Sequence, residues 1–261
     1  MKLENTFTQC IQNQKDIYNT ITFHADGQPT YEFKASIGLP LRKQPILNSS
    51  AFPTAQFTEI TEKRYLYRAV DTCIWKGMRC IYKQLQVDSM IDTLLREISS
   101  REKLMRHFGE KDPSLLSSRG INPILAIVVD GNPPLLYGIL LAFAGVSVDK
   151  LSGRQITIQH FASLITTVMH LQVAGLEHGD ICDRNVCVEG SSIQLIDFGE
   201  KASEYANDVI DTGRLMRLCV DRMRVRGDHE ATICKAASAL IERKDLKSAF
   251  TILEKGLEIE E

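Results

Sequence analysis

The sequence predicts a mixed α+β protein with a β-rich first half and an α-helical second half, which suggests two lobes with a cleft between them. Runs of strand-forming residues fill much of residues 57–143 and enclose one helical segment. After Gly145 the spacing of apolar residues becomes mainly helical. The length of 261 residues and the apolar content of 44% allow one two-lobed domain or two small domains with a sizeable core.

The first 57 residues carry the weakest pattern. Apolar and aromatic residues at 17–34 surround Asp26-Gly27-Gln28-Pro29, which predicts a β-hairpin. Prolines and an Asn-Ser-Ser run at residues 40–53 indicate a loop or linker. We therefore expect an N-terminal extension at 1–57, a β-rich lobe at 58–145 and a helical lobe at 146–261.

Strands and one helix are predicted for the β-rich lobe. Residues 57–85 read as two or three antiparallel strands with a turn at Lys76-Gly77. Residues 90–108 follow helical spacing, and Asp88 or Ser89 can cap the helix. Two apolar runs at 124–129 and 135–143, separated by Asp-Gly-Asn-Pro-Pro, predict a further hairpin.

Helices dominate the second lobe, apart from a loop-strand-turn-strand region that ends at Leu195-Ile196-Asp197. The predicted helices cover residues 156–173, 209–222, 230–243 and 246–259.

Composition excludes several classes of protein. The net charge of -2 argues against a general nucleic-acid or membrane-surface partner. The seven cysteines are odd in number and lack CxxC spacing, so neither a disulfide framework nor a zinc site is expected. The first ten residues have no apolar signal-peptide core, and the apolar run at 135–146 is far shorter than the ~20 residues that a membrane helix needs. We expect a cytoplasmic or nuclear protein.

The strongest chemical signal is His-Gly-Asp-Ile-Cys-Asp-Arg-Asn at residues 178–185, followed by Leu-Ile-Asp-Phe-Gly at 195–199. Phosphoryl transfer requires a carboxylate beside the attacking hydroxyl, and it requires hard oxygen ligands that hold Mg²⁺ against the phosphates. Asp180, Asn185 and Asp197 supply such a set. A hairpin between 186 and 196 would return Asp197 to the side of Asn185.

These residues resemble the protein-kinase superfamily, whose signature is H-x-D-x-x-x-x-N followed by D-F-G. Met169-His170 and Gly175 before the loop, and the Asp208 to Gly213 segment after it, resemble the flanking family pattern. The resemblance covers roughly residues 57–224. The chain is similar in particular to short, atypical kinase-like sequences of fungi.

The resemblance implies a role for each residue of the phosphate site. Asp180 would position the hydroxyl and accept its proton, and Asn185 and Asp197 would hold Mg²⁺. Lys83 lies in an Ile-Tyr-Lys run similar to the third-strand A-x-K, so it would clamp the ATP phosphates. Glu97 would orient Lys83, with Glu102 as the competing candidate.

The adenine site follows from the same resemblance. Leu141 would be the gatekeeper, and the backbone groups of Ala142, Phe143 and Ala144 would bind the adenine ring. Cys187 would lie under that ring. By the same comparison, His178 is a structural residue that supports the loop.

Several positions depart from the family pattern. No glycine occurs between residues 57 and 76, so the glycine-rich phosphate loop is missing. Gly179 replaces the arginine that pairs with a phosphorylated activation segment, and Cys182 replaces a lysine. Arg184 could neutralise phosphate charge in that lysine's place, or it is a surface residue. Only residues 199–207 separate the Asp-Phe-Gly from Asp208, and no Ala-Pro-Glu follows.

We expect a phosphotransferase that uses ATP and Mg²⁺ and acts on a protein serine or threonine hydroxyl. One alternative is a kinase of small hydroxylated molecules, because His-Gly-Asp and the short segment resemble aminoglycoside and choline kinases. Another is a nucleotide-binding pseudokinase module, which the missing glycines favour.

Overall fold

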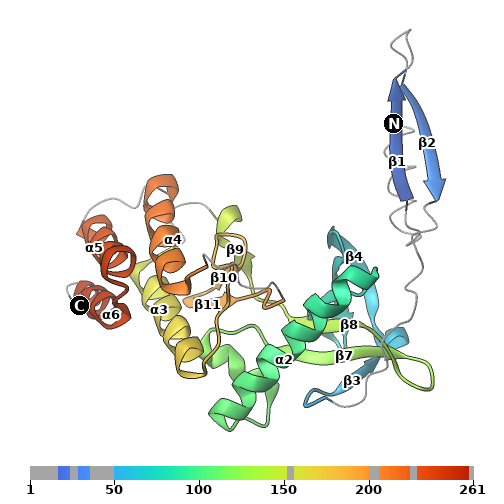
Figure 1. Cartoon of the computed structure of the whole chain (residues 1–261), viewed down its shortest axis with the longest axis horizontal. Coiled ribbons are helices and arrows are strands. Elements are labelled where there is room, and N and C mark those ends of the chain that lie inside the picture. The colour runs from blue at the N-terminus through green and yellow to red at the C-terminus, as the bar shows by residue number, and fades with distance from the viewer. Residues whose placement is uncertain are drawn as a thin grey trace.

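The computed structural model describes residues 17–23, 29–35, 50–151, 156–199, 206–223 and 228–258. It is a mixed α+β structure in which strands dominate the first part of the chain and helices the last part (Figure 1). The α+β prediction is confirmed at this level. Each predicted strand run and helix also has a counterpart among the elements described below.

A six-stranded sheet is built in the order β3-β7-β8-β6-β5-β4. All neighbours pair antiparallel except β3 and β7, which are parallel. The turn at Lys76-Gly77 is confirmed, with φ of 48° and 75° at the two residues. Because β3 joins the sheet, the sheet begins inside the stretch expected to be an extension. Its strands are β3 (Thr54–Gln56), β4 (Thr61–Tyr67), β5 (Val70–Trp75), β6 (Met78–Gln84), β7 (Ile124–Asp130) and β8 (Leu135–Ala142).

The two faces of this sheet bury different clusters, as the strand alternation requires. Cys80, Tyr82 and Leu140 belong to a small cluster on one face. Ile139 and Leu141 belong to the main core, which also contains Leu94 and Ile98 of α2 (Ile91–Phe108). Lys83 alternates with Tyr82 and therefore points to the face that α2 covers.

Helix α2 differs from the prediction at its start. A 3-10 turn, Asp88–Met90, precedes it, and the cap residue Met90 makes no side-chain hydrogen bond. The expectation that Asp88 or Ser89 caps the helix is therefore wrong, because that turn carries both residues ahead of the cap position. The helix ends at Gly109, whose φ of 68° favours glycine.

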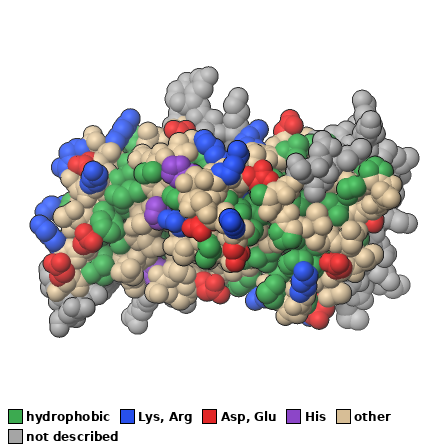
Figure 2. All heavy atoms as spheres, turned by 90° about the horizontal axis from the view of Figure 1, so that it is seen from below, with side chains coloured by type: hydrophobic (Ala, Val, Ile, Leu, Met, Phe, Trp, Pro, Cys, Tyr) green, Lys and Arg blue, Asp and Glu red, His purple; other side chains and the backbone are tan. Residues whose placement is uncertain are grey.

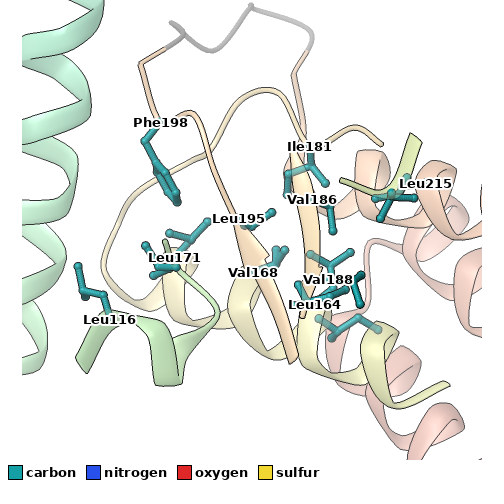
Figure 3. Packing of buried hydrophobic residues seen from close by; sticks show 14 of the residues in the cluster. Leu116, Leu164, Val168, Leu171, Ile181, Val186, Val188, Leu195, Phe198 and Leu215 are labelled. Atoms are coloured by element: carbon teal, nitrogen blue, oxygen red, sulfur yellow. The ribbon is translucent and has the colours of Figure 1, made fainter. Parts of the chain in front are cut away.

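The C-terminal part combines a three-stranded sheet with four helices. The sheet, in the order β11-β10-β9, packs on α3, and Figure 3 shows Leu164, Val168 and Leu171 close to Val188 and Leu195. The main core continues from the six-stranded sheet through these residues to α6. The elements are β9 (Val146–Ser147), α3 (Ile158–Val173), β10 (Val186–Glu189), β11 (Ser192–Leu195), α4 (Asp208–Met223), α5 (Asp228–Arg243) and α6 (Leu246–Leu257).

The predicted N-terminal hairpin is confirmed as β1 (Ile17–Phe23) paired antiparallel with β2 (Pro29–Ala35). Its turn at 24–28 and the predicted linker at 36–49 lie outside the described residues.

Acidic and basic side chains are mixed on the face of the molecule that Figure 2 shows. The six cysteines among the described residues are free thiols. In the same part of the chain, no helix combines the length and the apolar character needed to span a bilayer.

Candidate active site

Three charged side chains from separate elements meet at the edge between the six-stranded sheet and the loop after β11. Lys83 Nζ, on β6, lies 2.7 Å from Glu97 Oε2 on α2 and 2.6 Å from Asp197 Oδ1. The Glu97 side chain is fully buried, whereas Asp197 retains 31% of its side-chain exposure. Lys83 thus bridges one buried and one accessible carboxylate, which leaves the accessible one able to meet a ligand.

The two glutamates that competed as partner of Lys83 have separate environments. Glu102 Oε1 accepts hydrogen bonds from Ser50 Oγ at 3.0 Å and from the Ala51 N–H at 2.9 Å. The structure therefore brings Glu97, and not Glu102, to Lys83.

Sequence reasoning missed a fourth member of this cluster, Arg101. Its side chain is fully buried one turn after Glu97, with Nη1 3.2 Å from Glu97 Oε1. That ion pair is not aligned as a hydrogen bond, since Glu97 Oε1 has no hydrogen-bond donor. The i, i+4 spacing from Glu97 was the available signal, but such pairs usually lie on exposed helix faces.

The charges shift one another's protonation equilibria. Burial alone would lower the pKa of Lys83, but Glu97 and Asp197 outweigh it and raise that pKa above its usual value. Burial likewise would raise the pKa of Asp197, but Lys83 outweighs it, with help from Arg101, and the pKa falls. Lys83 and Asp197 are therefore both charged at neutral pH.

The loop with Asp180 is closed by Asn185. Asn185 Nδ2 donates to Asp180 Oδ2 at 2.8 Å and to the Asp180 carbonyl at 3.0 Å. The predicted hairpin is present, with Val186 paired to Leu195 and the Ile196 N–H donating to the Asn185 carbonyl. The hairpin therefore returns the chain to Asn185, as expected: Asp197 directly follows Ile196, which is hydrogen-bonded to Asn185.

A buried carboxylate at the start of α4 fastens the same loop. Asp208 accepts the His178 N–H at 2.7 Å and the Gly179 N–H at 2.9 Å. Gly179 has a φ of 81°, a conformation that glycine adopts without a Cβ penalty. The presence of glycine at this position thus has a backbone explanation.

His178 supports this region from inside. Its Nε2–H donates to the Ile196 carbonyl at 2.7 Å, while Nδ1 accepts the Asp180 N–H at 3.3 Å; this network assigns the tautomer. The ring contacts Phe198 at a centroid distance of 4.7 Å. Burial lowers its pKa, so the imidazole is neutral at pH 7 and serves as a structural link.

The chain around Asp197 is held against α2. Asp197 has a φ of 63°, which is uncommon outside glycine and is found at functional sites. Arg96 Nη1 donates to the Gly199 carbonyl at 2.6 Å. A Cβ on Gly199 would lie 2.8 Å from the Thr93 carbonyl oxygen, so this close approach requires glycine. Residues 200–205, most of the short segment after the motif, lie outside the described residues.

The donor set fits magnesium better than a transition metal. Asp197 offers an accessible carboxylate, and Asn185 turns its Nδ2 to Asp180, which makes the amide oxygen its candidate ligand atom. Within the described residues no group of three or more His, Cys, Asp or Glu side chains could hold a metal. Magnesium needs few protein ligands when phosphates and water complete its shell.

The residues expected around adenine lie at the end of β8 and on β10. Leu141 is buried, and the Ala142 N–H already donates to the Pro123 carbonyl at 3.1 Å. The Phe143 ring packs under the Arg79 guanidinium at 3.9 Å, and Ala144 is buried. Hydrogen bonds from this segment to an adenine base would therefore come from its carbonyl groups, or from the N–H groups of Phe143 and Ala144.

Cys187 lies across from this segment. It is buried on β10, where it pairs with Ser147 of β9, three residues after Ala144. Burial raises the pKa of its thiol to about 11, so it is a neutral, apolar surface. That character suits contact with a base, which is the expected role.

Tyr67 is a second residue that sequence reasoning missed. Tyr67 pairs with Val70, and Val70 pairs with Lys83, so the three side chains share one face of the sheet. Burial raises the pKa of the Tyr67 phenol, and the charge of Asp197 raises it further. A half-exposed tyrosine thus borders the site at the turn between β4 and β5.

Arg184 is exposed beside the loop. Its hydrogen bond to Cys182 and the nearby charge of Asp180 raise the pKa of its guanidinium. Its positive charge therefore lies close to the carboxylate expected to meet the acceptor hydroxyl.

No known family model matches the chain, and no curated protein matches its sequence. The geometry of the site is therefore the basis for any functional assignment.

Proposed function

We propose that the chain is an atypical kinase, with a two-lobed kinase-like arrangement, that transfers the γ-phosphate of ATP to a hydroxyl in a magnesium-dependent reaction. The observation that carries the proposal is the placement of Lys83 Nζ between Glu97 at 2.7 Å and Asp197 at 2.6 Å. A strand lysine paired with a helix glutamate and set beside the Asp-Phe-Gly carboxylate is the arrangement that phosphoryl transfer requires in this superfamily.

Each residue has a defined task in this reaction. Lys83 moves from Asp197 to the ATP phosphates, while Glu97 keeps its ammonium oriented. Asn185 and Asp197 would hold magnesium, which would neutralise charge that builds up on the transferred group. Arg184 adds a positive charge on the acceptor side.

Asp180 acts on the acceptor. As the acceptor oxygen bonds to the γ-phosphorus, Asp180 takes the hydroxyl proton, and the bond to the β–γ bridging oxygen breaks so that ADP leaves with that electron pair. The hydrogen bond from Asn185 Nδ2 holds the carboxylate in one orientation, which places it for this step.

The acceptor that we propose is a protein serine or threonine. A small hydroxylated molecule is the second candidate, and the glycine conformation at Gly179 favours it. A φ of 81° at that position favours glycine. The loop therefore does not depend on an arginine that pairs with a phosphorylated activation segment.

Labelled ATP tests the proposal. Purified protein is incubated with magnesium and ATP alone, with a generic protein substrate, and with a panel of hydroxylated metabolites. Transfer that disappears in Asp180→Ala and Asp197→Ala supports the proposal, and the acceptor that becomes labelled decides between the two candidates. Magnesium-dependent ATP binding without any transfer would indicate a pseudokinase module instead.

A further inference from the structure

Arg101 is the largest side chain that the described core buries completely. Its guanidinium contacts three different segments. Nε donates to the Asn122 carbonyl at 2.6 Å, and Nη1 donates to the Glu97 carbonyl at 3.3 Å and faces the Glu97 carboxylate at 3.2 Å. The guanidinium carbon also lies 4.8 Å from the centre of the Phe198 ring.

Two of these contacts lead to the loop that carries Asp197. The Asn122 N–H donates to the Leu195 carbonyl at 3.0 Å, so the Arg101–Asn122 bond continues to a residue two positions before Asp197. Phe198 follows Asp197 directly. One buried guanidinium thus links α2, the segment before β7 and both sides of Asp197.

The charges of the cluster explain why a cation is useful at this position. Lys83 and Arg101 face Glu97 and Asp197, so two positive groups balance two negative ones. If Lys83 turns to a phosphate, Asp197 gains the metal as its partner. Glu97 is fully buried and, without Arg101, would be left with a weakened counter-charge; an uncompensated buried carboxylate is strongly unfavourable.

A purely structural role would be served by a different residue. Apolar side chains of similar volume avoid the desolvation cost of a buried arginine and are often as stabilising or more so. The planar guanidinium, by contrast, donates to carbonyls, faces a carboxylate as an ion pair and lies against an aromatic ring at once. The presence of arginine therefore points to the charge and the geometry rather than to volume.

We propose that Arg101 is a positioning residue of the phosphate site, a fixed counter-ion for Glu97 that frees Lys83 for the phosphates and supports the Asp197–Phe198 turn. The inference rests on the proposed function, because it assigns Arg101 to the same ATP site. Arg101 itself would not touch the nucleotide.

The test compares the affinity for MgATP in four proteins of full length: wild type, R101M, R101K and R119M. Arg119 is the matched control, since it also pairs with a glutamate, Glu110 at 3.0 Å, and covers an aromatic ring, Phe108 at 4.0 Å, away from the cluster. We expect R101M to weaken MgATP binding about tenfold and R101K about threefold, and R119M to leave it unchanged. The KM for ATP should rise more than kcat falls.

The double variant E97Q/R101M separates positioning from folding. With a neutral glutamine in place of Glu97 no counter-ion is needed, so R101M should cost less than about threefold in MgATP affinity in the E97Q background. The same loss in both backgrounds, or a lower melting temperature with unchanged MgATP affinity, would overturn the inference. Absence of MgATP binding by the wild type would instead overturn the proposed function, and this inference with it.

Discussion

At the scale of single residues, Lys83 is the centre of the charged cluster. It is nearly buried, and it contacts two carboxylates that differ in exposure. The buried Glu97 holds the ammonium in place, and the ammonium can exchange its contact with the accessible Asp197 for a contact with a ligand. A lysine with one carboxylate partner could not keep an anchor while it made that exchange.

Lys83→Met should abolish phosphate transfer, because no other described cation replaces the ammonium between Glu97 and Asp197. We also expect the free energy of unfolding to fall by about 2 kcal/mol, less than for a fully broken buried pair because Arg101 still faces Glu97. Denaturant unfolding and a transfer assay measure the two effects. Lys103→Met, which removes an exposed lysine of α2 away from this cluster, should change neither.

The ionisation of Asp197 makes the free energy of unfolding depend on pH. Its pKa is lowered in the folded state, so its contribution is fully present above the ordinary aspartate value of about 4 and is lost as pH falls through the folded value. Asp197→Asn should therefore lower the free energy of unfolding by about 1 kcal/mol at pH 7, a figure reduced for its partial exposure. The difference from wild type should shrink below pH 4; a difference that grows with acidity would contradict the assignment.

At the scale of elements, helix α2 and the loop after β11 form one unit. Glu97 and Arg101 reach the Asp197 region through side chains, and Arg96 reaches it through the Gly199 carbonyl. The absence of a Cβ on Gly199 permits the contact with Thr93. The position of α2 therefore controls the position of the Asp197 carboxylate, which we propose to bind the metal.

Gly199→Ala should separate the loop from α2, since the added methyl group would lie 2.5 Å from Thr93 Cγ2 and 2.8 Å from its carbonyl oxygen. We expect MgATP affinity to fall about tenfold, which corresponds to about 1.4 kcal/mol. Isothermal titration measures it. Gly190→Ala is the control: its φ of 60° also disfavours alanine, but its Cβ meets nothing within 4 Å at a turn remote from α2, so MgATP affinity should not change.

Asp208 plays the corresponding part for the loop that carries Asp180. Asp208→Asn replaces one carboxylate oxygen by an NH₂ group, which cannot accept a backbone N–H. We expect a loss of about 2 kcal/mol in stability and a larger proportional loss of transfer activity than of ATP binding. Asp211→Asn, one turn further along α4, should cost less, because the partners of Asp211 are the exposed Arg214 and one backbone N–H, that of Asn207 at 3.3 Å. Equal effects of the two substitutions would contradict the role of Asp208.

At the scale of the whole molecule, one hydrophobic core runs from the six-stranded sheet to α6. The order of strands and helices could be predicted from apolar periodicity, because most of the described elements bury one apolar face in this core or in the smaller cluster on the other side of the sheet. The ends of elements were less predictable: a 3-10 turn precedes α2, and the cap residue Met90 makes no side-chain hydrogen bond that a sequence pattern would reveal. The pairing of β3 with β7 joins distant segments, which no local pattern encodes.

The candidate site was predictable where it depends on short spacing. The hairpin between Asn185 and Asp197 and the choice of Lys83 and Glu97 follow from sequence patterns, and the structure brings these residues together. Arg101 and Tyr67 could not be found in this way, because a buried arginine looks like an exposed helix charge in a sequence. The register that turns Tyr67 to the side of Lys83 is likewise visible only across three strands.

The most direct test of a phosphate site built around Lys83 and Asp197 is calorimetric titration of ATP into wild type and Asp197→Asn, with magnesium and with a chelator. We predict that magnesium strengthens ATP binding to the wild type at least tenfold, and that Asp197→Asn removes this gain. An ATP affinity that is the same with and without magnesium, or an equal gain in affinity from magnesium in Asp197→Asn, would contradict the proposed site.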